Sequence, residues 1–245
     1  MEVFLDPAAW MALLTLTLLE IVLGVDNIIF ISIVTNKLDP AVQSKARITG
    51  LAMALIFRIL LLLGITYLIQ FTKPIMTIVD YELSGRDIIL FIGGLFLIGK
   101  STAEIGEKME GASHDKEKKS APSFSMAIVQ IILLDIIFSF DSILTAIGLT
   151  EELVLMVTAV VISMIIMMAF AGKISKVITN HPSLEVLGLS FLILIGFMLV
   201  IDALHYHVPK GYIYFAVFFS LAVQLINIRI RKKSEPVVLH KRIEE

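Results

Sequence analysis

The sequence contains no cysteine, and charged residues make up only 17% of its 245 residues. The absence of cysteine excludes disulfide bonds, thiolate metal ligands and thiol catalysis. Hydrophobic residues make up 58% of the chain, and the mean hydropathy is +0.92. A soluble domain of this length does not cover so much apolar surface with so few charges. The composition therefore predicts a membrane protein, and the net charge of −2 gives no indication of a nucleic-acid partner.

The sequence also lacks the motifs of a targeting segment and of an enzyme. Its N-terminus has neither the basic region nor the cleavage site of a signal peptide, so we expect the first apolar segment to be retained. It contains no phosphate-binding loop, no nucleophile beside a base and no cofactor-binding motif. We therefore expect a protein that is not an enzyme and needs no cofactor.

Seven apolar segments are long enough to cross a bilayer as helices, which takes roughly 17–25 residues. Asp6-Pro7 and Asp39-Pro40 precede the first two segments, where Asp suits a helix N-cap and Pro suits the first turn. The sequence predicts an all-α, polytopic transmembrane fold. The predicted spans are about 9–34, 48–69, 87–105, 124–147, 153–178, 184–204 and 212–228.

Polar segments and basic residues predict how the chain is oriented. A polar stretch, about 106–123, is predicted to be a solvated cytoplasmic linker, and 236–245 a polar C-terminal tail. The loops after the first, third, fifth and seventh spans carry most of the Lys and Arg residues. Because positively charged loops stay in the cytoplasm, we predict a bacterial inner (plasma) membrane protein with its N-terminus outside and its C-terminus in the cytoplasm.

Two stretches of the chain resemble each other. Residues 20–28 (Glu-Ile-Val-Leu-Gly-Val-Asp-Asn-Ile) align without a gap with residues 135–143 (Asp-Ile-Ile-Phe-Ser-Phe-Asp-Ser-Ile). Carrying the alignment forward matches Arg58 with Lys173, which makes a chance resemblance unlikely. The third and sixth spans share only a weaker pattern of apolar residues and glycine.

The repeat unit contains three spans, an odd number, so two consecutive units must cross the membrane in opposite directions. We therefore predict two inverted three-helix repeats, about 9–105 and 124–204, followed by one extra helix. Together they form a single transmembrane domain, residues 1–235. Ion sites of transporters with this architecture lie near the midplane of the membrane, between the repeats.

Four acidic residues lie inside the predicted spans. Each costs roughly 2.5–3.5 kcal/mol at the centre of a bilayer unless it is neutralised or faces a polar interior. Gly24 and Ser139 each lie between two of the acids, and both residue types tolerate a kink or a local unwinding. Such a break would turn the acids toward one site and free backbone carbonyls as further ligands, and the residue types alone do not decide whether either helix has one. The acids are Glu20, Asp26, Asp135 and Asp141.

Together with the Asn27 amide and the Ser142 hydroxyl, these acids offer oxygen ligands only. Such ligands suit hard divalent cations such as Mn²⁺, Mg²⁺ and Ca²⁺. In one alternative, some of the acids carry protons and couple ion flux to a proton gradient. In another, the acids are structural, and Asn27 or Ser142 bonds a neighbouring helix. Arg58 has no lone pair to offer a metal, so we predict that it is a charge partner, and Gln130 either lines the same cavity or bonds a facing helix.

Charged residues near the ends of the spans have simpler interpretations. Lys100 and Glu104 lie four residues apart at the end of the third span and are predicted to be interfacial charges. Asp202, His205 and His207 resemble a metal-binding cluster, but their place at the end of the sixth span favours an interfacial loop.

The two acidic stretches and the run 207–214 (His-Val-Pro-Lys-Gly-Tyr-Ile-Tyr) resemble the TerC family of integral membrane proteins. The resemblance covers about 10–231 and is closest to the short bacterial subgroup without soluble regulatory domains. It implies a seven-helix fold related to the lysine-exporter superfamily and a role in metal-ion homeostasis, with manganese export the best supported. It also implies a set of metal ligands: Glu20, Asp26, Asn27, Asp135, Asp141 and Ser142.

The residues and the resemblance together predict a secondary transporter that exports a divalent cation, Mn²⁺ above all, from the cytoplasm. Its expected partners are the metal ion and the lipid bilayer, and the sequence indicates no oligomeric state. An exporter of a small organic cation or amino acid is one alternative, which a larger and partly apolar cavity would favour. The other alternative is an assembly or scaffold protein that transports nothing, although a scaffold has no need of four buried acids.

Overall fold

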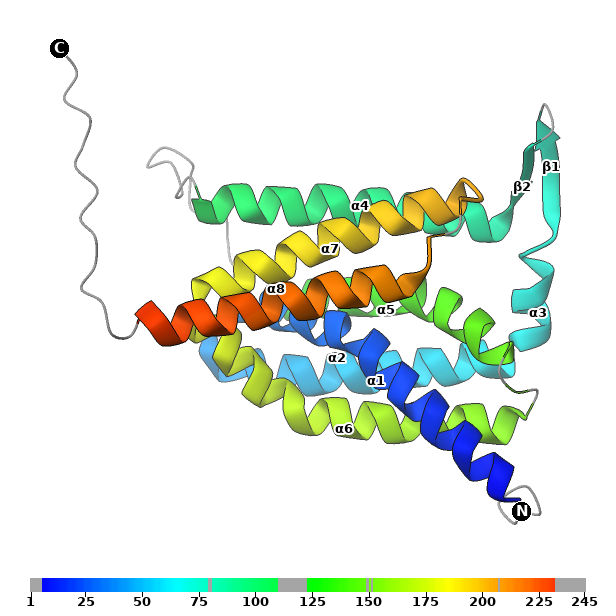
Figure 1. The fold of residues 1–245 in the computed structure, drawn as a ribbon, viewed down its shortest axis with the longest axis horizontal. Helices are drawn as coiled ribbons and strands as arrows, with labels where there is room; N and C mark the ends of the chain where they lie inside the picture. The colour runs from blue at the N-terminus through cyan, green and yellow to red at the C-terminus, as the bar shows by residue number, and fades with distance from the viewer. Residues whose placement is uncertain are drawn as a thin grey trace. The chain divides into compact units, whose positions relative to one another are not determined.

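The computed structural model is almost entirely helical, with one β-hairpin (Figure 1). It describes residues 6–78, 81–109, 123–148, 150, 152–206 and 208–231. Within these ranges the side chains at positions 25, 26, 77, 78, 81, 141, 145, 210 and 231 are not among those described. Most of the predicted linker, and the predicted C-terminal tail, lie outside the described residues.

Seven of the described helices are long and apolar enough to cross a membrane, as the sequence predicts, and only the short α3 is not. The helices are α1 (Pro7–Asn36), α2 (Pro40–Leu63), α3 (Ile65–Gln70), α4 (Gly85–Met109), α5 (Phe124–Ile147), α6 (Leu153–Asn180), α7 (Pro182–Ala203) and α8 (Lys210–Arg231). The strands are β1 (Pro74–Ile78) and β2 (Tyr81–Ser84), and they pair antiparallel.

The ends of the first two helices follow local signals in the sequence. The side chain of Asp6 accepts a hydrogen bond from the backbone N–H of Ala8, and that of Asp39 accepts one from Ala41, each at 2.9 Å. Both caps confirm the predictions from the Asp-Pro pairs. The predicted second span, about 48–69, starts within α2 but runs past its end, because α2 begins at Pro40 and ends before Gly64.

Helices α1 and α5 are each continuous through Gly24 and Ser139, so neither residue marks a local unwinding of its helix. Gly24 instead lets α6 approach α1 closely. A Cβ atom at Gly24 would lie 2.2 Å from the sulfur of Met167, so only glycine fits without moving that side chain. Gly24 is therefore a point of close packing between α1 and α6.

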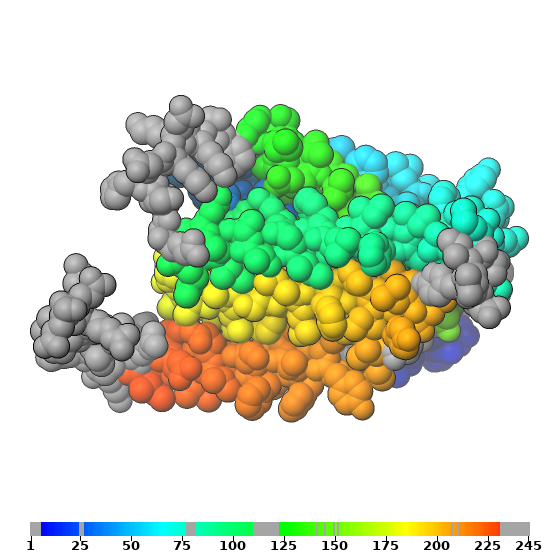
Figure 2. All heavy atoms as spheres, turned by 90° about the horizontal axis from the view of Figure 1, so that it is seen from above, coloured from blue at the N-terminus to red at the C-terminus, as the bar shows by residue number. Residues whose placement is uncertain are grey.

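Residues 1–208 form one compact unit, in which each helix of the first predicted repeat packs on a helix of the second. Helix α1 packs on α6, α2 on α5, and α4 on α7. In Figure 2, α4 (green) and α7 (yellow) form adjacent bands along their length. One apolar cluster lies mainly between α1, α2, α5 and α6, and a second involves α4 and α7. The opposite orientation of the two repeats stays a prediction.

The second unit, residues 209–245, contains α8. Its apolar stretch is long enough to span a membrane, and the rings of Phe215 and Phe219 stack with their centroids 6.2 Å apart. The first unit has two ends. The Asp6 end holds the start of α1, together with α3 and the hairpin, and the Lys37 end holds the end of α1 (Figure 1).

Helices α4 and α7 touch at a pair of glycines. A Cβ atom at Gly94 would lie 2.5 Å from the carbonyl oxygen of Gly196, and one at Gly196 would lie 2.8 Å from that of Gly94. Small residues let transmembrane helices approach closely enough for their backbones to pack. The weak glycine pattern shared by the two predicted repeats therefore marks a direct contact between them.

We expect Gly94→Ala to destabilise the protein by about 1–3 kcal/mol, because the added methyl group overpacks a backbone contact. The measurement is the temperature at which the detergent-purified protein stops eluting as a single species. Gly99→Ala is the matched control on the same helix, since a Cβ atom there meets nothing within 4 Å. Equal behaviour of the two variants would contradict the assigned contact.

Candidate functional site

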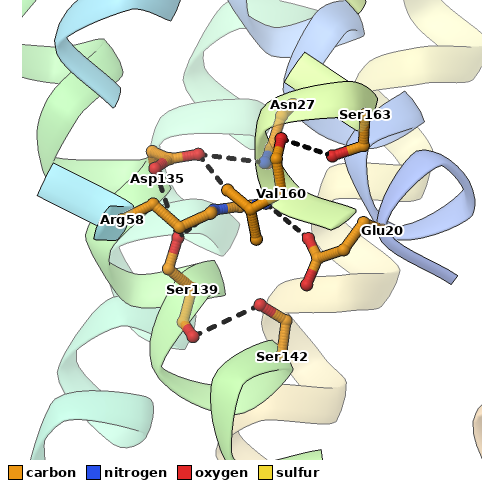
Figure 3. A network of polar contacts seen from close by, with 8 residues as sticks. All are labelled: Glu20, Asn27, Arg58, Asp135, Ser139, Ser142, Val160 and Ser163. Carbon is orange, nitrogen blue, oxygen red and sulfur yellow. Dashed lines mark hydrogen bonds and ion pairs between the residues drawn. The ribbon is translucent and has the colours of Figure 1, made fainter. Parts of the chain in front are cut away.

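The guanidinium group of Arg58 lies buried between helices α1, α2 and α5, with 2% of the residue exposed (Figure 3). Its Nη1 donates to Glu20 Oε2 at 2.6 Å, and its Nη2 donates to Asp135 Oδ1 at 3.1 Å. Its Nε donates to the Ser139 hydroxyl at 2.9 Å. One side chain of α2 thus joins α1 to α5 through two ion pairs and a further hydrogen bond.

The contacts extend beyond Arg58 to two more polar side chains. Asp135 also accepts hydrogen bonds from the Asn27 amide at 3.3 Å and from the Ser139 hydroxyl at 3.2 Å. Ser142 donates to the backbone carbonyl of Ser139 at 3.3 Å. All of these residues are buried. The Arg58 network consists of Glu20, Asn27, Arg58, Asp135, Ser139 and Ser142.

Helical periodicity explains why these residues meet. With about 3.6 residues per turn, positions seven apart lie on nearly the same face of a continuous helix. Glu20 and Asn27 therefore share a face of α1, and Asp135 and Ser142 share a face of α5. Ser139 lies one turn after Asp135 on that face. The helices need no break to bring these side chains together.

The charges of the Arg58 network depend on one another. Glu20 and Asp135 are both almost fully buried, at 2% and 4% exposure, and the same guanidinium contacts both. Its flat fork of N–H groups suits carboxylates, and such charge-assisted hydrogen bonds are among the strongest in proteins. Removing one side of a buried ion pair is costly because the remaining charge is left without a partner.

The space on the Asp6 side of Glu20 is apolar and closed. It is bounded by residues from α1, α2, α5 and α6, and it leaves no room for a water molecule. In Figure 3, Val160 and Ser163 of α6 lie beside the network, with the Ser163 hydroxyl donating to the carbonyl of Val160 at 2.9 Å. The residues that bound the space with Glu20 are Leu16, Leu62, Ile143, Ala146, Met156, Ala159 and Val160.

The Lys37 end is held by ion pairs. Lys37, just after α1, contacts both Glu104 and Glu107 of α4, and Lys108 of α4 contacts Glu185 of α7. Burial lowers the pKa of Lys37, but hydrogen bonds and charge from the two glutamates outweigh it, so the pKa is raised. Glu104 also pairs with Lys100 but is 4% exposed. It is therefore a buried link between helices rather than the interfacial charge that the sequence predicted.

At the Asp6 end, polar contacts join α4 to α7. Arg86 pairs with Asp202 at 2.6 Å, and Nε2 of His205 lies 3.1 Å from Asp87 Oδ2. Asp202 lies in the last turn of α7 and His205 just after that helix, so their predicted place at the end of the sixth span is confirmed, whereas the choice between an interfacial loop and a metal cluster stays a prediction. His207, the third member of the possible cluster, lies outside the described residues.

The structure brings together four of the six predicted ligands, Glu20, Asn27, Asp135 and Ser142. The side chains of the other two, Asp26 and Asp141, lie outside the described residues. Gln130 is half-buried on α5, and the described hydrogen bonds of the network do not include it. Among the described side chains, no group of three or more His, Asp or Glu is arranged to hold a metal ion.

Two features of the site differ from the sequence interpretation. Ser139 was singled out only as a residue that tolerates a bend in its helix, yet its hydroxyl accepts a hydrogen bond from Arg58 and donates one to Asp135. Its position four residues after Asp135 was the signal that could have identified it. Lys173, which aligns with Arg58, is exposed on α6, with its Nζ 5.5 Å from the ring centre of Phe170. The aligned basic residues therefore occupy different environments.

Comparison with known proteins places this arrangement in a family. The family model described as "Integral membrane protein TerC family" matches residues 5–236. The chain belongs to the TerC family. It is 53% identical over 232 residues to the UPF0053 inner membrane protein YgdQ of Escherichia coli (strain K12), which covers 95% of this chain and 97% of the relative. A UPF0053 protein of Haemophilus influenzae is 46% identical over 228 residues, covering 93% and 96% respectively.

The TerC fold also occurs as part of longer proteins. The UPF0053 inner membrane protein YoaE of Escherichia coli (strain K12) is 43% identical over 228 residues, and the match covers only 44% of its length. No solved structure matches this TerC-family chain. The names of the relatives and the seven apolar helices identify the chain as a multi-pass inner membrane protein.

We expect Glu20→Gln and Asp135→Asn each to lower the stability of the folded protein only slightly, because either variant keeps one carboxylate beside Arg58. The double variant leaves a buried cation without an acid in the network and should be less stable than the sum of the single effects by about 3–5 kcal/mol. Adding Arg58→Met should recover part of the loss. The measurement is thermal stability of the purified variants in detergent, and strictly additive losses would contradict the dependence of the two acids on one guanidinium.

Proposed function

We propose that this TerC-family protein is a secondary transporter that exports a divalent metal cation, Mn²⁺ above all, from the cytoplasm. The observation that carries the proposal is the meeting of Glu20 and Asp135 at one buried cationic group. These acids occupy corresponding positions of the two predicted repeats. Ion sites between inverted repeats are the rule for transporters of this architecture, and buried acids in membrane spans mark ion pathways.

The ligand chemistry of the Arg58 network supports a hard cation. Glu20 and Asp135 supply carboxylates, Asn27 an amide, and Ser139 and Ser142 hydroxyls. Mn²⁺ and Mg²⁺ accept such ligands, whereas soft ions prefer sulfur. In this proposal Asp26 and Asp141 complete the coordination, since they belong to the same duplicated motif.

The closure of the site supports a small ion over an organic substrate. The space that the described residues leave beside Glu20 has no room for a water molecule, so it does not accommodate a molecule as large as an amino acid. Apolar side chains close the Asp6 side, and ion pairs hold the Lys37 end. An ion held between two barriers of this kind reaches either side of the membrane only when one barrier opens, which is the basis of alternating access.

The direction of export depends on the proposed orientation, with the Lys37 end in the cytoplasm. The basic residues at this end, Lys37, Lys45, Arg47, Lys100 and Lys108 among them, support that orientation through the positive-inside rule.

The test is the manganese content of cells that lack their other manganese exporters. We expect the wild-type protein to lower cytoplasmic Mn²⁺, and Asp26→Asn, Asp141→Asn and Glu20→Gln each to abolish this effect because a ligand is lost. Glu152→Gln is the control, since Glu152 is exposed at the start of α6, outside the network. Expression and insertion of every variant are checked in isolated membranes.

If inserted wild-type protein leaves the manganese content unchanged, the proposed substrate is wrong, and other cations are tested in the same cells. Full activity of the acid variants would contradict the ligand assignment. Co-purification with another membrane complex, together with indifference to all of these substitutions, would favour the scaffold alternative.

A further inference from the structure

Arg58 occupies the place that a bound cation would need. Its guanidinium contacts Glu20 Oε2 and Asp135 Oδ1, and it donates to the Ser139 hydroxyl as well. A metal ion bound by these oxygens would lie directly beside the guanidinium group, whose positive charge repels it. The described geometry therefore corresponds to a site filled by the protein's own cation.

This internal cation comes from only one of the two predicted repeats. Lys173 aligns with Arg58 but lies exposed on α6, beside the ring of Phe170. Glu20 and Asp135 occupy matching positions and both face the site, whereas among the described side chains one basic group, that of Arg58, serves both of them. A purely structural charge balance between equivalent repeats has no need of this asymmetry.

We propose that Arg58 is an exchangeable counter-ion, which neutralises Glu20 and Asp135 when the site is empty and leaves them when the transported cation binds. The inference rests on the proposed function and adds the residue that controls access to its site. It also accounts for the absence, among the described side chains, of a ready-made group of three acids around an open position.

The physical reason for such an exchange lies in the return of the empty transporter. Unpaired carboxylates inside a membrane are costly, so a carrier that has released its cargo is stabilised if a fixed positive charge takes the cargo's place. Arginine suits this role because it stays charged at every accessible pH and binds two carboxylates at once through its planar fork.

An internal competitor lowers the apparent affinity for the cargo. If only a minor fraction of molecules has Arg58 away from the acids, the measured affinity falls in proportion to that fraction. Minor conformational states are commonly populated at about 10% or less. Removing the guanidinium should then strengthen cation binding about tenfold or more, whereas loss of a structural ion pair would weaken it.

The experiment measures Mn²⁺ binding to the full-length protein in detergent by equilibrium dialysis. We expect Arg58→Gln to bind Mn²⁺ about tenfold more tightly than wild type and yet to fail in net export from cells, because its empty site is no longer neutralised. Arg58→Lys keeps the charge without the fork and should bind with intermediate affinity. Lys173→Gln, which changes the aligned but exposed residue, should match wild type in both measurements.

A competition experiment separates exchange from structural support. In Arg58→Ala, millimolar guanidinium chloride should weaken Mn²⁺ binding competitively because the free ion refills the vacated place, and it should have little effect on the wild type. If guanidinium instead strengthens Mn²⁺ binding to Arg58→Ala, Arg58 is a structural support and the exchange is wrong.

The remaining outcomes distinguish the two proposals. If wild type and folded Arg58→Gln bind Mn²⁺ equally, or if Arg58→Gln binds more weakly, the exchange is overturned while the cation site stands. If neither the wild type nor any single-position variant binds Mn²⁺, the proposed function fails, and the inference fails with it. Elution of each variant as a single species shows that it is folded. If Arg58→Gln does not fold, Arg58→Lys provides the comparison with wild type.

Discussion

The structure depends on the neutralisation of buried carboxylates by one guanidinium. Glu20 and Asp135 lie deep in helices that are otherwise apolar, and Arg58 contacts both. Without this contact each acid would be an unpaired charge inside the bundle, which membrane insertion strongly disfavours. The same contact ties three helices from both predicted repeats to one point. It therefore sets the register of α1, α2 and α5 as well as the chemistry between them.

Close helix packing keeps these charges together and keeps water out. Gly24 lets Met167 of α6 lie against α1, and the contact of Gly94 with Gly196 brings α4 and α7 to backbone distance. In a membrane, apolar side chains gain little by leaving lipid, so such small-residue contacts and buried polar bonds supply much of the drive for helix association. The polar network and the glycine contacts thus both hold the helices of the bundle together.

The two ends of the bundle are closed by different chemistry, which bears on how a cation site between them would work. The Asp6 side of the site is blocked by apolar side chains, whereas the Lys37 end is held by ion pairs such as that of Lys37 with Glu104. Ion pairs can exchange partners or hydrate, and an apolar constriction opens by wetting. Because Arg58 neutralises the acids, a cation site between the two ends would be stable with both the apolar side chains and the ion pairs in place.

The sequence by itself determined the features that depend on local or periodic signals. Long apolar runs predicted the membrane helices, Asp6 and Asp39 the starts of the first two, and the duplicated motif the acids Glu20 and Asp135, which are buried. Only the tertiary structure decided which residues meet, because contacts between helices depend on their relative rotation and height rather than on local pattern. It placed Ser139 in the Arg58 network and left Lys173 exposed while Arg58 is buried. The hairpin after α3 also escaped prediction, since its strands are too short to stand out beside apolar spans.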